Sequence, residues 1–160
     1  MSIQPTTSQS HRDLPGEGQS PAELRLTRSM WQWMIEHARQ CAPLECCGVL
    51  MGHVENGASF VTSVMPSRNI SPHDRTRSFQ LDWTTMREAC AISDKEILGF
   101  YHSHPASAPF PSEDDYNGTW YGFACLILGH PFDSPQSLRA WEVPAPHHAF
   151  VSRPVIIYDA

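Results

Sequence analysis

The chain has 160 residues, which fits one domain and argues against a two-domain enzyme or a TIM barrel. Eleven Lys and Arg against seventeen Asp and Glu give a formal net charge of −6. A net negative charge disfavours binding to the phosphate backbone, so nucleic acid is not expected as a partner. Hydrophobic residues make up 41% of the chain, enough for a buried core. The longest apolar run, 123–128, is too short to span a membrane, and no membrane partner is expected.

Residues 1–21 differ in composition from the rest of the chain. They are rich in Ser, Thr, Gln, Pro and Gly, which predicts a disordered tail ahead of one domain at 22–160. They also lack the apolar centre of a secretory signal, so the expected location is the cytoplasm. The five cysteines are an odd number without a C-x-x-C pair. This argues against a disulfide framework and a cysteine zinc site, and we expect reduced, mostly buried thiols.

Local patterns in the first half of the domain predict strands around one helix. Alternating and helical spacings of apolar residues indicate a short strand at Leu24 and Leu26, a helix at 28–40, and strands at 46–54 and 58–65. Asn56-Gly57 between the last two segments is a strong hairpin signal, so these strands should pair antiparallel. In the helix, Trp31 is expected in the core and Trp33 on the surface.

The second half alternates strands with short helices. The expected elements are a strand at 77–81, a helix capped by Asp82 that ends near Asp94 with Met86, Ala89 and Cys90 facing inward, a strand at 96–104, a short helix opened by Ser112, and strands at 123–128, 138–143 and 150–158. Mixed order with long crossovers predicts an α/β sandwich around a mixed sheet rather than an all-β barrel.

The chemistry is concentrated in His102-Ser103-His104-Pro105 and the following Ser112-Glu113-Asp114-Asp115. Because strand side chains alternate faces, His102 and His104 project from the same side and are close enough to share one ion. Asp115 falls in the first turn of the next helix, where its carboxylate can face the end of the strand. Two imidazoles and a carboxylate with an open fourth position are typical of a catalytic zinc that holds a water.

Other interpretations of these residues stay open at this point. Two histidines on a strand can be ordinary polar residues, and Ser112-x-x-Asp115 also resembles a helix capping box. A non-haem iron oxygenase uses the same ligand types and is the alternative chemistry. The zincin pattern H-E-x-x-H and the deaminase pattern with C-x-x-C are absent from the sequence.

Two further pairs of residues have simpler explanations than chemistry. His147 and His148 are adjacent, so their rings point to opposite faces, as expected of a solvated loop. Cys46 and Cys47 are also adjacent, and core packing is favoured over a redox pair because strained vicinal disulfides are rare.

Taken together, Glu45 before Cys47-Gly48-Val49-Leu50-Met51-Gly52, then His102-Ser103-His104-Pro105 and Ser112-x-x-Asp115, resemble the motif of the JAMM (MPN+) metallopeptidases. The resemblance implies the α/β MPN fold, with His102, His104 and Asp115 as ligands of one zinc ion. It also implies Glu45 as general acid/base and Ser112 as an oxyanion-stabilising group. Without the family pattern, a Glu ahead of a strand would be taken for a surface residue.

The chain resembles the compact prokaryotic members of this family more than the eukaryotic deubiquitinases with their insertions. The resemblance implies a zinc peptidase that cuts the peptide or isopeptide bond after the C-terminal Gly-Gly of a ubiquitin-like sulfur-carrier protein, releasing cysteine or a short tail. The alternatives are a deubiquitinase-like isopeptidase, a non-haem iron enzyme and a non-catalytic MPN interaction module. Metal content separates the iron enzyme, and activity on a Gly-Gly-tailed carrier separates the interaction module.

Overall fold

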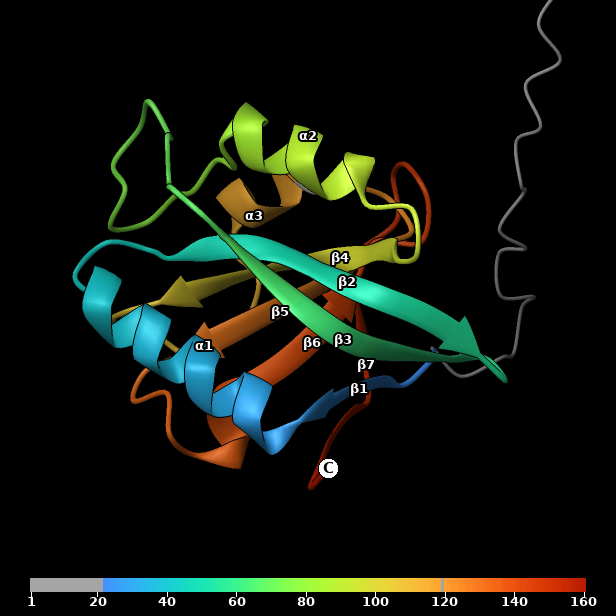
Figure 1. Ribbon diagram of the computed structural model, residues 1–160. Helices are drawn as coiled ribbons and strands as arrows, with labels where there is room; N and C mark the ends of the chain where they lie inside the picture. The colour runs from blue at the N-terminus through green and yellow to red at the C-terminus, as the bar shows by residue number, and fades with distance from the viewer. Residues whose placement is uncertain (1–21, 119) are drawn as a thin grey trace, which may run out of the picture.

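The computed structural model describes residues 22–118 and 120–160 (Figure 1). The disordered tail expected at 1–21 lies outside the described residues. Within the described part, strands form one mixed sheet in the order β7-β6-β5-β4-β2-β3-β1-β8. Helix α1 lies on one side of the sheet, and α2 and α3 lie on the other (Figure 1). The expected α/β sandwich around a mixed sheet is therefore confirmed.

The elements mostly follow one another with short connections, and the segment at 68–82 between two of them is longer. They are β1 (Leu24–Thr27), α1 (Arg28–Cys41), β2 (Cys47–Glu55), β3 (Ala58–Ser67), α2 (Trp83–Ala91), β4 (Glu96–His104), α3 (Glu113–Gly118), β5 (Ala124–Gly129), the 3-10 turn η1 (Pro135–Ser137), β6 (Leu138–Glu142), β7 (Val151–Arg153) and β8 (Val155–Tyr158). No helix among the described residues is long and apolar enough to cross a membrane.

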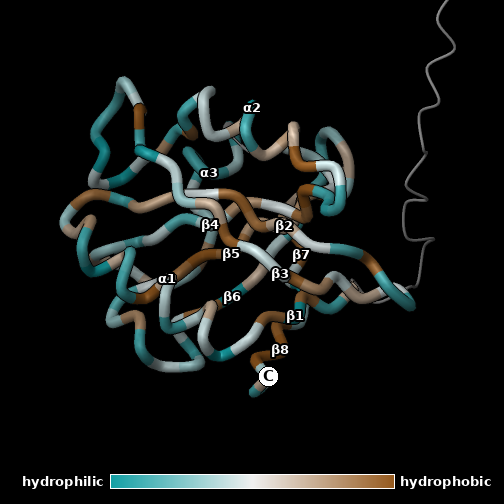
Figure 2. Tube along the Cα trace, in the orientation of Figure 1, coloured by the Kyte–Doolittle hydropathy of each residue, from teal (hydrophilic) through white to brown (hydrophobic). Residues whose placement is uncertain are grey.

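Alternation along the strands gives the sheet a hydrophobic core on each face. Leu50 of β2 packs with the buried side of α1, whereas its neighbours Val49 and Met51 pack with Met86 of α2. Figure 2 shows hydrophobic stretches along the inner strands and mostly hydrophilic residues in the surrounding loops. The face under α2 and α3 also carries the side chains of His102 and His104, so the second core supports the candidate site.

The register of β2 against β4 fixes one side of this site. The two strands are antiparallel, and Cys47 at the start of β2 lies opposite His102 near the end of β4. Glu45, two residues before Cys47, is therefore brought to the end of β4. At the far end of β2, Asn56 and Gly57 have φ values of 49° and 77°, as a two-residue hairpin turn requires, and the expected hairpin is confirmed.

The expected strand at 77–81 is wrong. Within the described part this segment forms a single bridge, between Leu81 and Asn69. The side chain of Asn69 instead takes two of its backbone groups, donating to Ser78 O and accepting from Gln80 N, while Gln80 O accepts from Ile70 N. Because these backbone groups already have hydrogen-bond partners, the segment does not pair with a neighbouring strand.

Two further expectations need correction. Helix α2 ends at Ala91 rather than near Asp94, with Ile92 already extended, and Cys90 is exposed because it is turned about 100° away from buried Ala89. The single strand expected at 150–158 is interrupted at Pro154, which cannot donate a ladder hydrogen bond. Strand β7 pairs with β6 and β8 pairs with β1, so the two halves lie at opposite edges of the sheet.

Candidate metal centre

The candidate site lies at the end of β4, on the face covered by α2 and α3. His102 and His104 are 1% and 5% exposed, and Asp115 in the first turn of α3 is 3% exposed. Ser103 between the histidines faces the other way, where its Oγ accepts a hydrogen bond from Cys46 N. The alternation expected along this strand is thus present.

Three side chains meet in this pocket through two ring nitrogens and the two carboxylate oxygens of Asp115, at nearly equal separations. Nε2 of His102 is 3.2 Å from Nε2 of His104, and each nitrogen is 3.1 Å from one carboxylate oxygen of Asp115. Among the described residues, this is the group of three whose ligand atoms lie close enough together to hold a metal ion. The structure therefore brings together the three residues predicted as zinc ligands.

Asp115 is held by the start of its own helix. Ser112 N donates to Asp115 Oδ2 at 2.8 Å, and Asp115 N donates to Ser112 Oγ at 3.1 Å, so the capping arrangement and the site share the same residues. Burial opposes ionisation, but His102 and the hydrogen bonds from both histidines and from Ser112 hold the pKa of Asp115 well below its usual range. The carboxylate is therefore anionic, as a metal ligand must be.

The orientation of His104 follows from a backbone contact. Its Nδ1 lies 2.9 Å from Ala108 O, and because a carbonyl can only accept, Nδ1 carries the proton. Nε2 faces Asp115 and His102. Burial lowers the pKa of His104, but its hydrogen bonds with Asp115 and Ala108 raise the pKa overall, so Nε2 can donate to Asp115 in the metal-free protein and would offer its lone pair to a metal ion in exchange for that proton. A histidine whose outer nitrogen donates to a backbone carbonyl is a common arrangement at metal sites.

His102 is held by packing rather than by a hydrogen bond at its outer nitrogen. The ring of Phe79 stacks on it with centroids 4.3 Å apart and an interplanar angle of 21°. Burial lowers the pKa of His102, which favours the neutral ring that can bind a metal ion. No sequence pattern indicated Phe79, because this contact depends on the course of the 71–81 segment.

Glu45 lies two residues before the start of β2, and its side chain extends to the same site. Its backbone N–H donates to Arg75 O at 2.8 Å, and its carbonyl accepts from the side chain of Asn69 at 3.1 Å. Its Oε1 lies 4.0 Å from His104 Nε2. Burial raises the pKa of Glu45 to about 8, against the opposing effect of His104. Glu45 is thus beside the three predicted ligands without being part of their close contacts.

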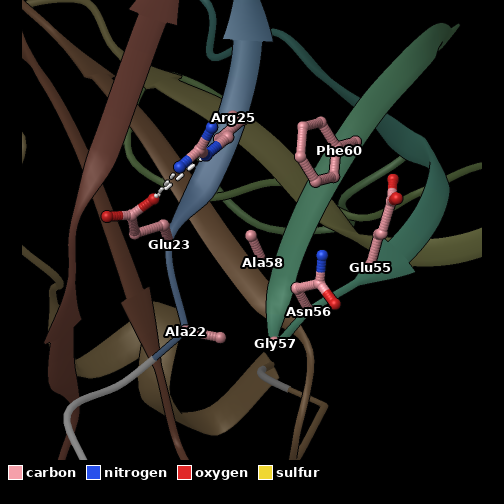
Figure 3. Close-up of a pocket in the computed structure, with 8 residues that line it drawn as sticks. All are labelled: Ala22, Glu23, Arg25, Glu55, Asn56, Gly57, Ala58 and Phe60. Carbon is pink, nitrogen blue, oxygen red and sulfur yellow. Dashed lines mark hydrogen bonds and ion pairs between the residues drawn. The ribbon is translucent and has the colours of Figure 1, made fainter.

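A cleft of about 470 Å³ opens next to Asp115. It runs between the 71–81 segment, the start of α2 and the end of α3, and includes Phe79, Trp83 and Trp120 in its lining. A second hollow of about 550 Å³ lies beside the hairpin turn at Asn56 and Gly57, at the other end of β2 from Glu45 (Figure 3). Only the first is next to a predicted ligand.

The cysteine, histidine and tryptophan pairs considered in the sequence have the structural roles expected of them. Cys46 and Cys47 are free and buried, and burial raises the pKa of each thiol to about 12, which confirms core packing. His147 and His148 are exposed. Trp31 is buried and Trp33 is exposed, as expected.

The residues of the pocket fit a divalent metal ion of the zinc type. Two neutral imidazole nitrogens and one carboxylate are zinc ligands, and separations of 3.1–3.2 Å match neighbouring ligands about 2 Å from a shared ion. Two buried polar atoms of the pocket, Oε2 of Glu45 and Nδ1 of His102, also lack hydrogen-bond partners among the described residues.

A mixed sheet between α1 and α2, with His-x-His at a strand end and an aspartate in the next helix, defines a domain of the JAB/MPN class. The model of the family described as prokaryotic homologs of the JAB domain matches residues 27–144. The chain belongs to this family, which confirms the expected membership in the prokaryotic part of the JAMM (MPN+) group.

Two curated proteins show how the chain relates to known hydrolases. It is 36% identical to the desampylase of Haloferax volcanii over 102 residues, which are 59% of this chain and 71% of that protein. It is 29% identical to AMSH-like ubiquitin thioesterase 1 of Arabidopsis thaliana over 122 residues, which are 71% of this chain. The match spans only 23% of the plant protein.

Solved structures confirm the MPN fold. A protein of Desulfitobacterium hafniense superposes with a TM-score of 0.68 at 24% identity, covering 86% of this chain and 94% of that one. A JAB1/MPN domain protein from Archaeoglobus fulgidus superposes with a TM-score of 0.53 at 18% identity, covering 86% and 99%.

Proposed function

We propose that this chain is a zinc-dependent peptidase that hydrolyses the peptide or isopeptide bond after the C-terminal Gly-Gly of a ubiquitin-like sulfur-carrier protein, releasing cysteine or a short tail. The observation that carries the proposal is the buried group of His102, His104 and Asp115 with Glu45 4.0 Å away. Relatives that are named as a desampylase and a ubiquitin thioesterase support a substrate of the ubiquitin-like class.

In this proposal His102, His104 and Asp115 hold one zinc ion, which when bound polarises the scissile carbonyl and acidifies water. Glu45 takes the proton of the attacking water and later gives it to the leaving amine. A pKa of about 8 suits both steps near neutral pH. Ser112 Oγ accepts from Asp115 N, so its own hydroxyl proton is available for the developing oxyanion.

The cleft next to Asp115 receives the substrate tail in this proposal. Gly-Gly suits a narrow approach because it has no side chains and can lie extended. The proposal also keeps the cytoplasm as the location of the chain, and the five free cysteines are compatible with a reducing compartment.

The test is direct cleavage. The purified chain with zinc is incubated with ubiquitin-like carriers extended beyond Gly-Gly, and intact mass is followed by mass spectrometry. We expect loss of the piece after Gly-Gly and no loss with the His104→Ala variant. Metal analysis of the same sample should give about one zinc per chain.

Other outcomes of this experiment distinguish the alternatives. Activity that returns to the metal-free protein with iron alone would favour a non-haem iron enzyme. Cleavage of polyubiquitin with all carriers left intact would favour a deubiquitinase, the reaction class to which the name of the plant relative points. A zinc-loaded chain that cuts neither would favour a non-catalytic interaction module.

A further inference from the structure

The seven residues between His104 and Ser112 form a segment that we call the Pro loop, residues 105–111. This loop connects two of the predicted ligands, since β4 ends at His104 and α3 brings in Asp115. It is anchored from outside the site. The indole Nε1–H of Trp141 donates a hydrogen bond to Pro109 O at 3.0 Å. Trp141 belongs to β6, two strands away from β4, so this contact ties the loop to the body of the sheet.

Packing around this hydrogen bond supports the same anchor. The ring of Phe110 lies 5.5 Å from the ring of Trp141, and the guanidinium of Arg139 lies 5.3 Å from the centroid of Phe110. On β5, a Cβ at Gly129 would lie only 2.5 Å from Cδ of Pro109, so the loop rests directly on the backbone of β5. The Pro loop therefore has a defined position set by β5 and β6.

This position determines where the carbonyl of Ala108 points. Ala108 O accepts from Nδ1 of His104 and from Phe110 N, each at 2.9 Å, and the carbonyl bound by Trp141 belongs to Pro109, the residue between Ala108 and Phe110. A loop freed at Pro109 would let the Ala108 carbonyl turn away from the imidazole. His104 would then lose the contact that keeps the proton on Nδ1 and the lone pair on Nε2.

We infer that Trp141 is a positioning residue for His104: by holding the Pro109 carbonyl, it keeps Ala108 in place to select the tautomer of His104 that binds metal. The inference rests on the proposed zinc site and extends it to a residue in another strand. Trp141 acts on His104 through the Pro loop, by way of its contacts with Pro109 and Phe110.

The experiment uses the full chain with Trp141→Phe, which keeps an aromatic ring and removes the N–H donor. Trp33→Phe is the matched control, because Trp33 is exposed on α1 at the opposite face of the sheet. Zinc affinity is measured by competition with a chromophoric chelator. Contacts of this supporting kind typically change metal affinity by 10- to 100-fold, and we expect roughly tenfold weaker binding for Trp141→Phe and no change for Trp33→Phe.

A second readout needs neither metal nor substrate. Long-range 1H–15N spectra of the metal-free protein report which ring nitrogen of His104 carries the proton. We expect an Nδ1–H that is hydrogen-bonded and protected from exchange in the wild type, and loss of that protection in Trp141→Phe. If Trp141→Phe does not fold, benzothienylalanine at position 141 keeps the indole shape and replaces only the N–H with sulfur.

The outcomes separate this inference from the proposed function. A variant that lacks the 141 donor yet has wild-type zinc affinity and a wild-type His104 spectrum would overturn the role of Trp141 and leave the peptidase proposal standing. If the wild type bound no zinc, the proposed function would fail, and the tautomer spectra of the metal-free proteins would still decide the role of Trp141.

Discussion

Two carboxylates share the site, and their surroundings move their pKa values in opposite directions. Asp115 receives hydrogen bonds from two histidines and the Ser112 backbone, which keep its pKa low despite burial. Glu45 is buried with one oxygen lacking a partner among the described residues, and burial raises its pKa to about 8. Carboxylates whose pKa values differ in this way can take different roles, one as an anionic ligand and one as a proton carrier.

Glu45→Gln tests the second role. We expect this variant to keep its zinc, since Glu45 is not a predicted ligand, and to lose turnover by about 10² to 10⁴, because an amide cannot accept the proton of water. Steady-state rates and metal content of the same preparation check both parts. A variant with a near-normal rate would remove Glu45 from the mechanism.

Ser112→Ala tests the hydroxyl at the start of α3. Removing one oxyanion donor costs roughly 10² to 10³ in turnover in other hydrolases, and a comparable or milder loss is expected here. The substitution also removes the acceptor of Asp115 N, so thermal unfolding is measured in parallel. Ser107→Ala, an exposed residue of the Pro loop, is the control. Equal rates for the two variants would exclude a catalytic hydroxyl at Ser112.

At the scale of elements, the segment between β3 and α2 depends on one amide. Asn69 donates to Glu45 O and Ser78 O and accepts from Ser71 N and Gln80 N, so all its hydrogen-bonding capacity is used. This one side chain joins the backbone of Glu45 to the segment that carries Phe79. Glu45 and the ring stacked on His102 are thus positioned together.

Asn69→Ala should therefore destabilise the fold. Leaving buried partners unsatisfied costs about 1 to 3 kcal/mol each, and because this segment is partly exposed, water limits the total free energy of unfolding lost to about 2 kcal/mol. Urea unfolding of Asn69→Ala and of His73→Ala, an exposed neighbour, gives the measurement. Equal midpoints for the two variants would contradict the role given to Asn69.

The elements that could be predicted from sequence are those whose signal is local. The helical spacing around Trp31, the turn at Asn56-Gly57 and the buried run at 96–104 each determine an element through neighbouring residues. The segment at 77–81 could not be predicted, because its hydrogen bonds go to Asn69 and Ile70, whose positions depend on the hairpin. The break at Pro154 has a local signal, but the pairing of its two halves with opposite edges of the sheet depends on the whole topology.

The residues of the site also divide into those with a local signal in the sequence and those without one. The convergence of His102 and His104 follows from strand alternation alone, and the helix start places Asp115. Glu45 enters through the register of β2 against β4, which no local pattern contains, so only the family motif pointed to it. Phe79 and Trp141 had no signal in the sequence, because each acts through a contact between distant segments.

For the whole molecule, the proposed zinc ion would link β4 to α3. A ligand that binds only the folded state stabilises it by mass action, by about 4 kcal/mol when its free concentration is 1,000 times Kd. For a domain of this size each kcal/mol raises Tm by about 2 to 4 °C, so saturating zinc should raise the Tm of the metal-free protein by roughly 10 °C. Differential scanning calorimetry with and without zinc checks this. His104→Ala should show little or no rise, and an equal rise in that variant would place the zinc elsewhere.

The last prediction concerns how the whole domain selects its substrate. The cleft next to Asp115 is bounded by the 71–81 segment, α2 and α3, with Trp83 and Trp120 in its lining. A folded carrier cannot enter a space of about 470 Å³, but an extended tail can, with its last residues against the site. Side chains at the end of the tail would then keep the scissile bond away from the ligands.

Replacing the second Gly of the carrier tail with Val should therefore nearly abolish cleavage. A displacement of about 1 Å at the reacting bond is enough to cost roughly 100-fold in rate, and a branched side chain at that position requires at least this much. Intact mass spectrometry of wild-type and Gly→Val carriers under the same zinc concentration measures the two rates. A Val substitution in an exposed loop of the carrier serves as the control and should leave the rate unchanged. Equal cleavage of the Gly→Val tail would show that the domain does not select its substrate by close approach of the tail backbone.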